Sequence, residues 1–330
     1  MFTKETTKRV KKRIEFGGII AEPGQKACGF CPVPGTDAAF PVTVINGRGE
    51  GKTVLITSAI HGCEYPSIEA VFELAEDILD PEIIKGQIVI INPVNVDAFI
   101  NRRPYIVPAD GKNLNRLFPP DPYGSTGDKM AWVLAEEFIK KMDFHIDTHG
   151  GDIPETQPSY VYYPGMGDRK EALALAEEAA RYVLHAKYML KSRATNHAYT
   201  YAGMIGVPSL ELELGECTRW SRQEVDEYLE NILNVLKFLE VYPGQAVRRP
   251  ENLPVKTITE GVYLDADYSG RWYPLAGRDD QVKKGQKIGI IKDLFGHVLK
   301  EYYAEYDGEV LMVVATLAIK KGDPIIAYGR

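Results

Sequence analysis

Short apolar segments alternate with amphipathic helical segments between residues 40 and 241, and this alternation limits the fold more than any other feature of the chain. The segments that we expect to be strands are mostly rich in apolar residues: 40–46, 53–60, 87–93, 143–149 and 207–214. Apolar residues at helical spacing mark the segments expected to be helices: 67–80, 128–142, 168–184 and 221–241. Strands that alternate with helices predict an α/β sheet with helices on its faces. The first two strands are expected to form a pair joined by the glycine-rich loop 47–52.

The pattern changes near residue 243. Pro243, Gly244, Pro250 and Pro254 lie in a polar segment, and no helical period follows it. Short alternating segments with frequent glycines then run to the end of the chain, which is typical of a small all-β domain. The sequence therefore predicts an α/β domain over residues 1–247 and a small, barrel-like β domain over residues 248–330, in agreement with the total length of 330 residues.

Charge and composition exclude several classes of partner. Lys and Arg number 39 against 46 Asp and Glu, so the net charge of −7 argues against binding to a nucleic-acid backbone. No apolar run approaches the ~20 residues of a membrane span. The N-terminal segment is basic but lacks the apolar stretch of a secretory signal, and four cysteines fit a reducing compartment. We expect a cytoplasmic protein that acts on a small molecule, and the sequence leaves a homo-oligomer open.

Two His residues and a Glu occupy positions that favour a metal site. His61 follows an apolar strand and Glu64 begins the next helix, so the two side chains can converge on one ion. His149 ends another strand, at the edge of an open α/β sheet where ligand sites collect. A catalytic zinc commonly takes three protein ligands of these types plus water. His145 lies about 13 Å earlier along the same strand and is expected to be a hydrogen-bonded core residue. Asp147, one pleat behind His149, is a candidate polar partner for it.

Each half of this constellation has a simpler interpretation. A His-x-x-Glu sequence arises often by chance, and the strand with His149 could be only a hydrogen-bonded core strand. The two motifs together favour a metal site.

Two further segments carry candidate functional groups. Asn115 and Arg116 lie in a long polar loop, where an amide and a guanidinium could hold a carboxylate, and Arg102 and Arg103 precede them. Glu211 and Glu213 share one face of an apolar strand, and Glu213 is nearer the end, where it could act as a general base. The simpler interpretations are solvated surface arginines and a structural ion pair between the glutamates and the arginines.

The order and spacing of four motifs resemble the zinc carboxypeptidase-like succinylglutamate desuccinylase/aspartoacylase family over roughly residues 35–330. The motifs are His61-x-x-Glu64, Asn115-Arg116, Asp147-x-His149 and Glu213-Leu214-Gly215. Asn92-Pro93 and the run from Asp110 to Arg116 support the resemblance.

That resemblance implies a mixed sheet with helices on both faces and a set of site residues. One Zn²⁺ per chain would be held by His61, Glu64 and His149, with Glu213 as the catalytic carboxylate. Asn115 and Arg116 would hold the substrate carboxylate. Arg103 or Arg102 would polarise the scissile carbonyl.

The expected function is that of a zinc-dependent amidohydrolase, a deacylase that cleaves the amide bond of a small N-acyl amino acid with a free carboxylate. A metallocarboxypeptidase that acts on peptides is the alternative enzyme. A non-catalytic metal-binding or carrier protein is the alternative outside enzymes, because the turns at 285–289 and 307–310 resemble those of a lipoyl or biotinyl carrier. Residues 311–313 offer no lysine for such a modification, so we expect the β domain to be a wall or lid over the site.

Overall fold

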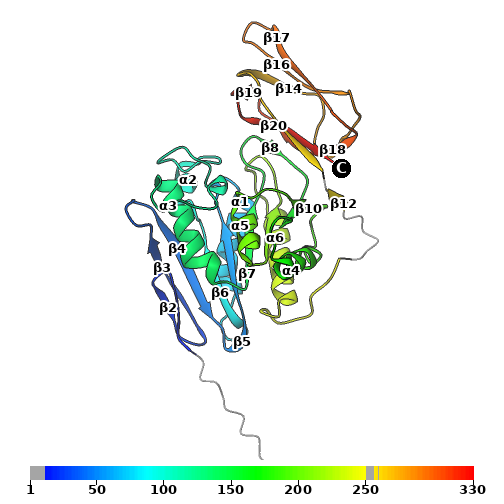
Figure 1. Ribbon diagram of the computed structural model, residues 1–330. Helices are drawn as coiled ribbons and strands as arrows, with labels where there is room; N and C mark the ends of the chain where they lie inside the picture. Colours follow the sequence, from blue (N-terminus) through cyan, green and yellow to red (C-terminus); the bar gives the residue numbers. More distant parts are fainter. Residues whose placement is uncertain (1–11, 250–255, 259) are drawn as a thin grey trace, which may run out of the picture.

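A mixed nine-stranded sheet forms the centre of the molecule (Figure 1). The computed structural model describes residues 12–249, 256–258 and 260–330. The strand order is β12-β10-β9-β11-β7-β5-β6-β4-β3. The strands span β3 (Gln25–Pro32), β4 (Ala39–Asn46), β5 (Gly49–Ser58), β6 (Lys85–Ile91), β7 (Phe144–His149), β9 (Tyr160–Pro164), β10 (Tyr188–Ser192), β11 (Ser209–Glu213) and β12 (Lys256–Ile258). A short hairpin of β1 (Ile14–Phe16) and β2 (Ile19–Ala21) precedes them.

The centre of the sheet is parallel, which brings several strand ends to one edge. β5 pairs in parallel with both β6 and β7, and β7 pairs in parallel with β11. His149 is opposite Glu213 in the register of β7 and β11, so two predicted site residues are neighbours on adjacent strands. β4 pairs with β6 and not with β5, so the expected strand pair is wrong as a pair although both strands are present.

Helices cover both faces of the sheet, as predicted, because alternate residues of its strands face opposite sides. Val54 and Ile56 of β5 pack in one core with the helices α1 (Tyr65–Glu73), α4 (Lys170–Ala180) and α6 (Arg222–Phe238). Leu55 packs in the other core with α3 (Thr126–Val133) and α5 (Ala198–Ile205). α2 (Val96–Asn101) lies in the long loop after β6. π-helical turns at Leu74–Ile78 and Leu134–Phe138 extend α1 and α3, and 3₁₀ turns occupy Leu114–Arg116 and Ile139–Lys141.

The C-terminal part consists of two antiparallel sheets around a core of their own, which confirms the prediction of an all-β unit. One sheet contains β13 (Gly261–Asp265), β20 (Pro324–Gly329), β18 (Gly308–Val314) and β15 (Gln281–Val282). The other contains β17 (Val298–Tyr303), β16 (Lys287–Lys292), β14 (Gly270–Pro274) and β19 (Ala318–Ile319). Trp272 is fully buried between them, and a Cβ atom at residue 289 would lie 1.9 Å from its ring, so only glycine fits there.

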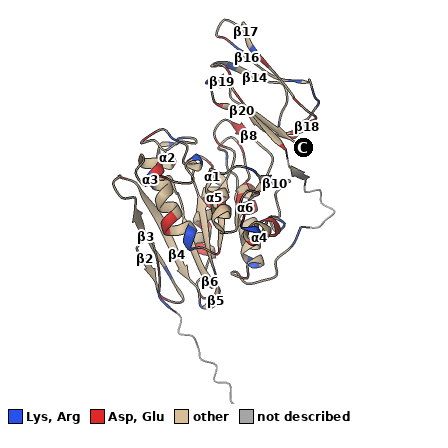
Figure 2. Cartoon of the chain, in the orientation of Figure 1, with Lys and Arg blue, Asp and Glu red and all other residues tan. Residues whose placement is uncertain are grey.

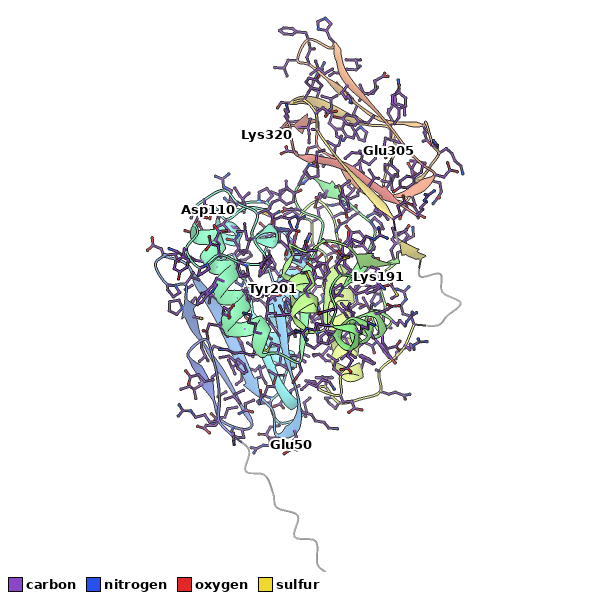
Figure 3. All side chains as sticks on the ribbon, viewed as in Figure 1. Glu50, Asp110, Lys191, Tyr201, Glu305 and Lys320 are labelled. Atoms are coloured by element: carbon purple, nitrogen blue, oxygen red, sulfur yellow. The ribbon has the colours of Figure 1, made fainter. Side chains whose placement is uncertain are left out.

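Two strand pairings connect the two parts of the chain. β8 (Glu155–Thr156), in the segment that follows β7, pairs with β18 of the C-terminal sheets. β12 follows the predicted boundary at residues 247 and 248 but pairs in parallel with β10 of the main sheet. Lys191, at the end of β10, lies where the main sheet meets the C-terminal part (Figure 3). The boundary itself stays a prediction.

Charged residues of both signs are spread over the helices and loops, and the central strands carry few of them (Figure 2). The described part of the chain contains no helix that is both long enough and apolar enough to cross a membrane. All four cysteines are free.

Candidate active site

His61 and Glu64 lie in the short turn between β5 and α1. Glu64 is the N-cap residue of α1, and Pro66 occupies its first turn. Gly62 lets this turn pack directly on the backbone of α2, because a Cβ atom at residue 62 would come within 2.3 Å of the carbonyl carbon of Ala98. The turn is therefore held in place by a close backbone contact.

His149, the last residue of β7, completes a buried group with these two residues. Its Nδ1 lies 3.1 Å from Glu64 Oε2, and His61 Nδ1 lies 2.7 Å from Glu64 Oε1. One ligand atom from each of the three side chains lies within 4.8 Å of the others. Glu64 Oε2 makes no hydrogen bond with any residue that the structure describes, although it is buried. A buried carboxylate oxygen between two imidazoles is a good ligand for a metal ion, so the residues fit one.

The electrostatics of the group also favour a cation. Burial alone would lower the pKa of His61 and of His149, but the surrounding carboxylates, Glu64 foremost, together outweigh burial and raise both pKa values. Burial would raise the pKa of Glu64, and the two imidazoles lower it instead. The negative charge that favours protons on the rings would equally favour a metal cation between them.

The far side of His149 faces acidic and amide groups. Its Nε2 lies 3.4 Å from Asp147 Oδ2 and 3.6 Å from Glu211 Oε2. Thr57 Oγ1 donates to Asp147 Oδ1 at 2.6 Å and fixes that carboxylate. Carboxylates in this position orient a ligating imidazole, because they accept the proton of the nitrogen that does not bind metal.

His145 is a core residue, as predicted. It is fully buried, and its Nε2 lies 2.7 Å from Thr57 Oγ1. Because that hydroxyl donates to Asp147, the imidazole must be the donor in this contact. Burial lowers the pKa of His145 to about 4, so the ring is neutral.

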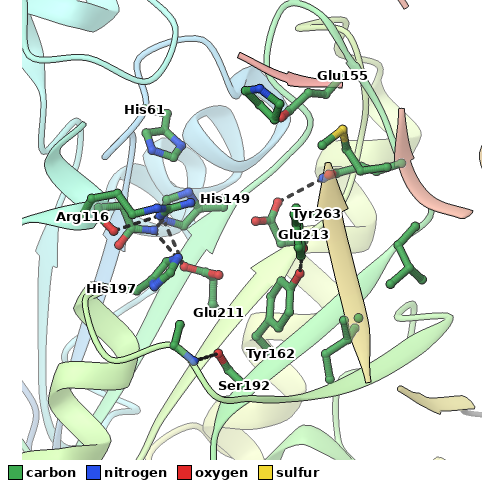
Figure 4. A pocket seen from close by; sticks show the side chains of 18 of the residues that line it. His61, Arg116, His149, Glu155, Tyr162, Ser192, His197, Glu211, Glu213 and Tyr263 are labelled. Atoms are coloured by element: carbon green, nitrogen blue, oxygen red, sulfur yellow. Dashed lines mark hydrogen bonds and ion pairs between the residues drawn. The ribbon is translucent and has the colours of Figure 1, made fainter. Parts of the chain in front are cut away.

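A cavity of about 840 Å³ opens on this group (Figure 4). His61, Glu64, His149, Asn115, Arg116, Glu211 and Glu213 all line it. Arg116 and His197 are on one side of the cavity in Figure 4, and Tyr162 and Tyr263 are on the other. Tyr263 and Met312 belong to the C-terminal sheets, so the β domain forms a wall of the cavity, as expected.

Glu213 is held at the rim of β11 by an amide. Gln157 Nε2 donates to Glu213 Oε2 at 3.0 Å, and Tyr160 OH donates to Gln157 Oε1 at 2.6 Å. Burial raises the pKa of Glu213 well above its usual value, with Glu211 adding to the effect and His149 opposing it. A carboxyl group with a raised pKa can hold a proton near neutral pH.

Of the three arginines that the sequence predicts near the site, only Arg116 lines the cavity. Arg116 lines the cavity, and its Nη1 donates to the Asn115 carbonyl at 2.9 Å. Arg102 and Arg103 are exposed, and neither lines the cavity, although their neighbour Tyr105 does. Asn115 is buried, and its amide is occupied by protein groups: Nδ2 donates to Glu211 Oε2 at 3.1 Å, and Oδ1 accepts from Ala198 N at 3.0 Å.

Several cavity residues escaped the sequence analysis. They lie on loops, in the short strand β8, at a helix start or in the β domain, away from the strand ends that the motifs mark: Gln157, Tyr105, Glu155, His197 and Tyr263.

Comparison with known proteins identifies a family. A sequence model of the succinylglutamate desuccinylase/aspartoacylase catalytic domain matches residues 50–239. A curated relative, the N-alpha-acetyl-L-2,4-diaminobutyric acid deacetylase of Halomonas elongata, is 28% identical over 293 residues, which cover 87% of this chain and 84% of that protein.

Solved structures share the fold over almost the whole chain. A succinylglutamate desuccinylase/aspartoacylase from Rhodobacter sphaeroides matches with a TM-score of 0.78 at 23% identity, covering 94% of this chain and 97% of that one. The product-bound ectoine utilization protein EutE (DoeB) from Ruegeria pomeroyi matches with a TM-score of 0.80 at 23% identity, covering 92% and 94%.

Proposed function

This chain belongs to the succinylglutamate desuccinylase/aspartoacylase family, and we propose that it is a zinc-dependent amidohydrolase that removes the acyl group from a small N-acyl amino acid. The observation that carries the proposal is the convergence of three kinds of group on one cavity: the ligand set His61, Glu64 and His149, the carboxyl group of Glu213, and the guanidinium of Arg116. Hydrolysis of such an amide requires a metal ion, a general base and a group that binds the substrate carboxylate.

The ligand set favours zinc over harder cations, because two imidazoles and one carboxylate are the set of several zinc hydrolases. A zinc ion held there supplies a Lewis acid, which lowers the pKa of a water molecule and polarises a carbonyl. Asp147 Oδ2, 3.4 Å from His149 Nε2, would favour the tautomer that carries its proton on Nε2 and leaves Nδ1 to ligate.

Glu213 carries the proton in this proposal. It takes a proton from the attacking water and passes it to the leaving nitrogen, so that one carboxyl group acts as base and then as acid. Gln157 holds one carboxylate oxygen through a hydrogen bond and leaves the other free for this transfer.

Arg116 is the proposed binding group for the free carboxylate of the substrate. A guanidinium matches a carboxylate with two parallel hydrogen bonds, and Arg116 already lines the cavity. Arg103 remains the proposed residue for the scissile carbonyl, with Arg102 as the alternative. Because both side chains are exposed, this role requires the loop that carries them to turn inward when substrate binds.

The Halomonas relative supports an acylated amino acid as substrate, since its described activity is removal of an acetyl group from diaminobutyric acid. The acid part of that substrate would match Arg116. An activity screen identifies the acyl group and the amino acid of the substrate.

The test is a hydrolysis screen of the zinc-loaded protein. Acetyl-, succinyl- and longer acyl-amino acids are compared with their carboxamides and with peptides that have free C-termini, and the released amine is measured. We expect turnover of the free acids, loss of turnover on chelation and poor turnover of the carboxamides. Turnover of peptides alone would establish a metallocarboxypeptidase instead. Zinc binding without turnover of any compound would favour a non-catalytic protein.

A further inference from the structure

His197 is a polar group in the cavity that the proposed reaction does not use. It is the N-cap residue of α5 and lines the cavity on the same side as Arg116 (Figure 4). Its position is fixed: the backbone N–H of His197 donates to Thr200 Oγ1 at 3.1 Å, and its ring packs on Tyr199 with a centroid distance of 5.7 Å.

The imidazole of His197 has unused hydrogen-bonding capacity. Its Nδ1 is buried and makes no close hydrogen bond with any residue that the structure describes, although the side chain faces the backbone N–H of Thr200 in a capping box. Burial and the neighbouring Arg116 lower the pKa of His197 to about 2, so the ring is neutral and offers one N–H donor and one acceptor. A buried polar group without a partner costs stability unless something fills the role, such as a ligand.

Asn115, which the sequence pairs with Arg116 as a carboxylate clamp, is buried and already engaged with protein groups at both ends of its amide, including His149 Nε2 at 3.4 Å from Nδ2. Its Nδ2 donates to Glu211, and its Oδ1 accepts from the backbone of Ala198. The second of these bonds ties the start of α5 to the residue that precedes Arg116. The Asn115 amide therefore fixes the position of His197 relative to Arg116. A residue other than Asn115 must then supply the second hydrogen-bond donor to the substrate carboxylate.

We propose that His197 and Arg116 together bind the free carboxylate of the substrate, with the imidazole as the second donor and Asn115 as the residue that positions both. This inference rests on the proposed function, because it identifies the carboxylate-binding group of the same reaction. His197 would then set the preference of the enzyme for free acids over neutral analogues.

The test compares His197→Phe with the unaltered protein on a matched pair of substrates, an N-acyl amino acid and its carboxamide. A hydrogen bond to a charged group corresponds to a loss of about 10- to 100-fold on removal. We expect KM for the free acid to rise by that factor in His197→Phe, with kcat little changed. The carboxamide should be unaffected, so the preference for the free acid falls. His197→Gln, which keeps an N–H donor, should recover part of the preference.

Two controls separate this role from a structural one. His185→Phe replaces a histidine that is paired with Glu230 at the surface, and it should behave as the unaltered protein does. Zinc content and circular dichroism should be the same in all variants, and His197→Ala replaces the phenylalanine variant if that variant does not fold.

Calorimetric titration of the free acid into the metal-free protein gives a readout that does not depend on turnover. Binding should weaken in His197→Phe and not in His185→Phe. An unchanged ratio of free acid to carboxamide, or unchanged binding in the titration, would overturn the role of His197. A protein that binds the free acid through His197 but cleaves no acyl amino acid would contradict only the proposed reaction.

Discussion

At the scale of single residues, two glutamates of one strand compete for the role of base, and their contacts distinguish them. Glu211 accepts a hydrogen bond from Asn115 and faces His149 Nε2, whereas Glu213 accepts one from Gln157 and ends the strand β11. Burial raises the pKa of both carboxyl groups, that of Glu211 to about 7, so it is the contacts that favour Glu213 as the base. Glu213→Gln should keep one zinc and reduce kcat by about 10²- to 10⁴-fold, the usual contribution of a general base. Glu211→Gln is the matched variant and should retain more turnover. Steady-state kinetics and metal analysis of both variants test this assignment. A larger loss of kcat in Glu211→Gln than in Glu213→Gln would assign the role of base to Glu211.

His145 should make stability depend on pH. Its pKa is about 4 in the folded protein, where the ring is buried and neutral, and about 6.5 when the chain is unfolded. Between these values the unfolded chain binds more protons, so the contribution is complete above pH 6.5 and is lost as pH falls towards 4. The loss is about 2 kcal/mol by pH 5. Urea unfolding at pH 7 and pH 5 should show a smaller loss for His145→Gln than for the unaltered protein. Equal losses would mean that His145 is not held neutral.

At the scale of elements, the turn that carries two of the proposed ligands depends on one backbone contact. A methyl group at residue 62 would meet the backbone of Ala98 in α2, which cannot move aside as a flexible side chain can. Gly62→Ala should therefore displace His61 and Glu64 and weaken zinc binding by at least about tenfold, in addition to lowering the unfolding midpoint. Gly277→Ala, where a methyl group has room, is the control. Zinc competition titration checks the result, and equal affinities in both variants would show that the turn tolerates the methyl group.

The elements that the sequence predicts are those whose own residues decide their structure. The sequence pattern is clear enough to predict the elements β5, β7, β11 and α6 directly. The proposed metal ligands lie at the ends of β5 and β7 and at the start of α1. β3 and α5 were missed because tertiary packing overrides their weak local preference. β3 is an edge strand with glycine, lysine and proline, and α5 contains threonine, tyrosine and glycine. His197 was missed together with α5, since no motif marks the start of an unpredicted helix.

At the scale of the whole molecule, the β domain completes a cavity that the main sheet begins. The sequence predicts the β domain and its role as a wall, but the individual contacts come only from the structure, because they join residues far apart in the chain. Tyr162 and Tyr263 share a hydrogen bond of 2.5 Å between their hydroxyl groups, one from each part of the molecule. The pairing of β8 with β18 connects the segment after His149 to the same domain. A sequence motif gives the order of residues along the chain but not the direction of their side chains. The sequence therefore could not show that Arg102 and Arg103 are exposed.

The central claim is that His61, Glu64 and His149 hold one metal ion per chain, and metal content tests it most directly. The purified protein and His149→Ala are each loaded with zinc, freed of excess ion and measured by elemental analysis, with the surface variant His185→Ala as control. We predict one equivalent of zinc in the unaltered protein and in His185→Ala, and a loss of most of it in His149→Ala, because two remaining ligands bind zinc weakly. A full equivalent of zinc in His149→Ala would contradict the assignment of the site.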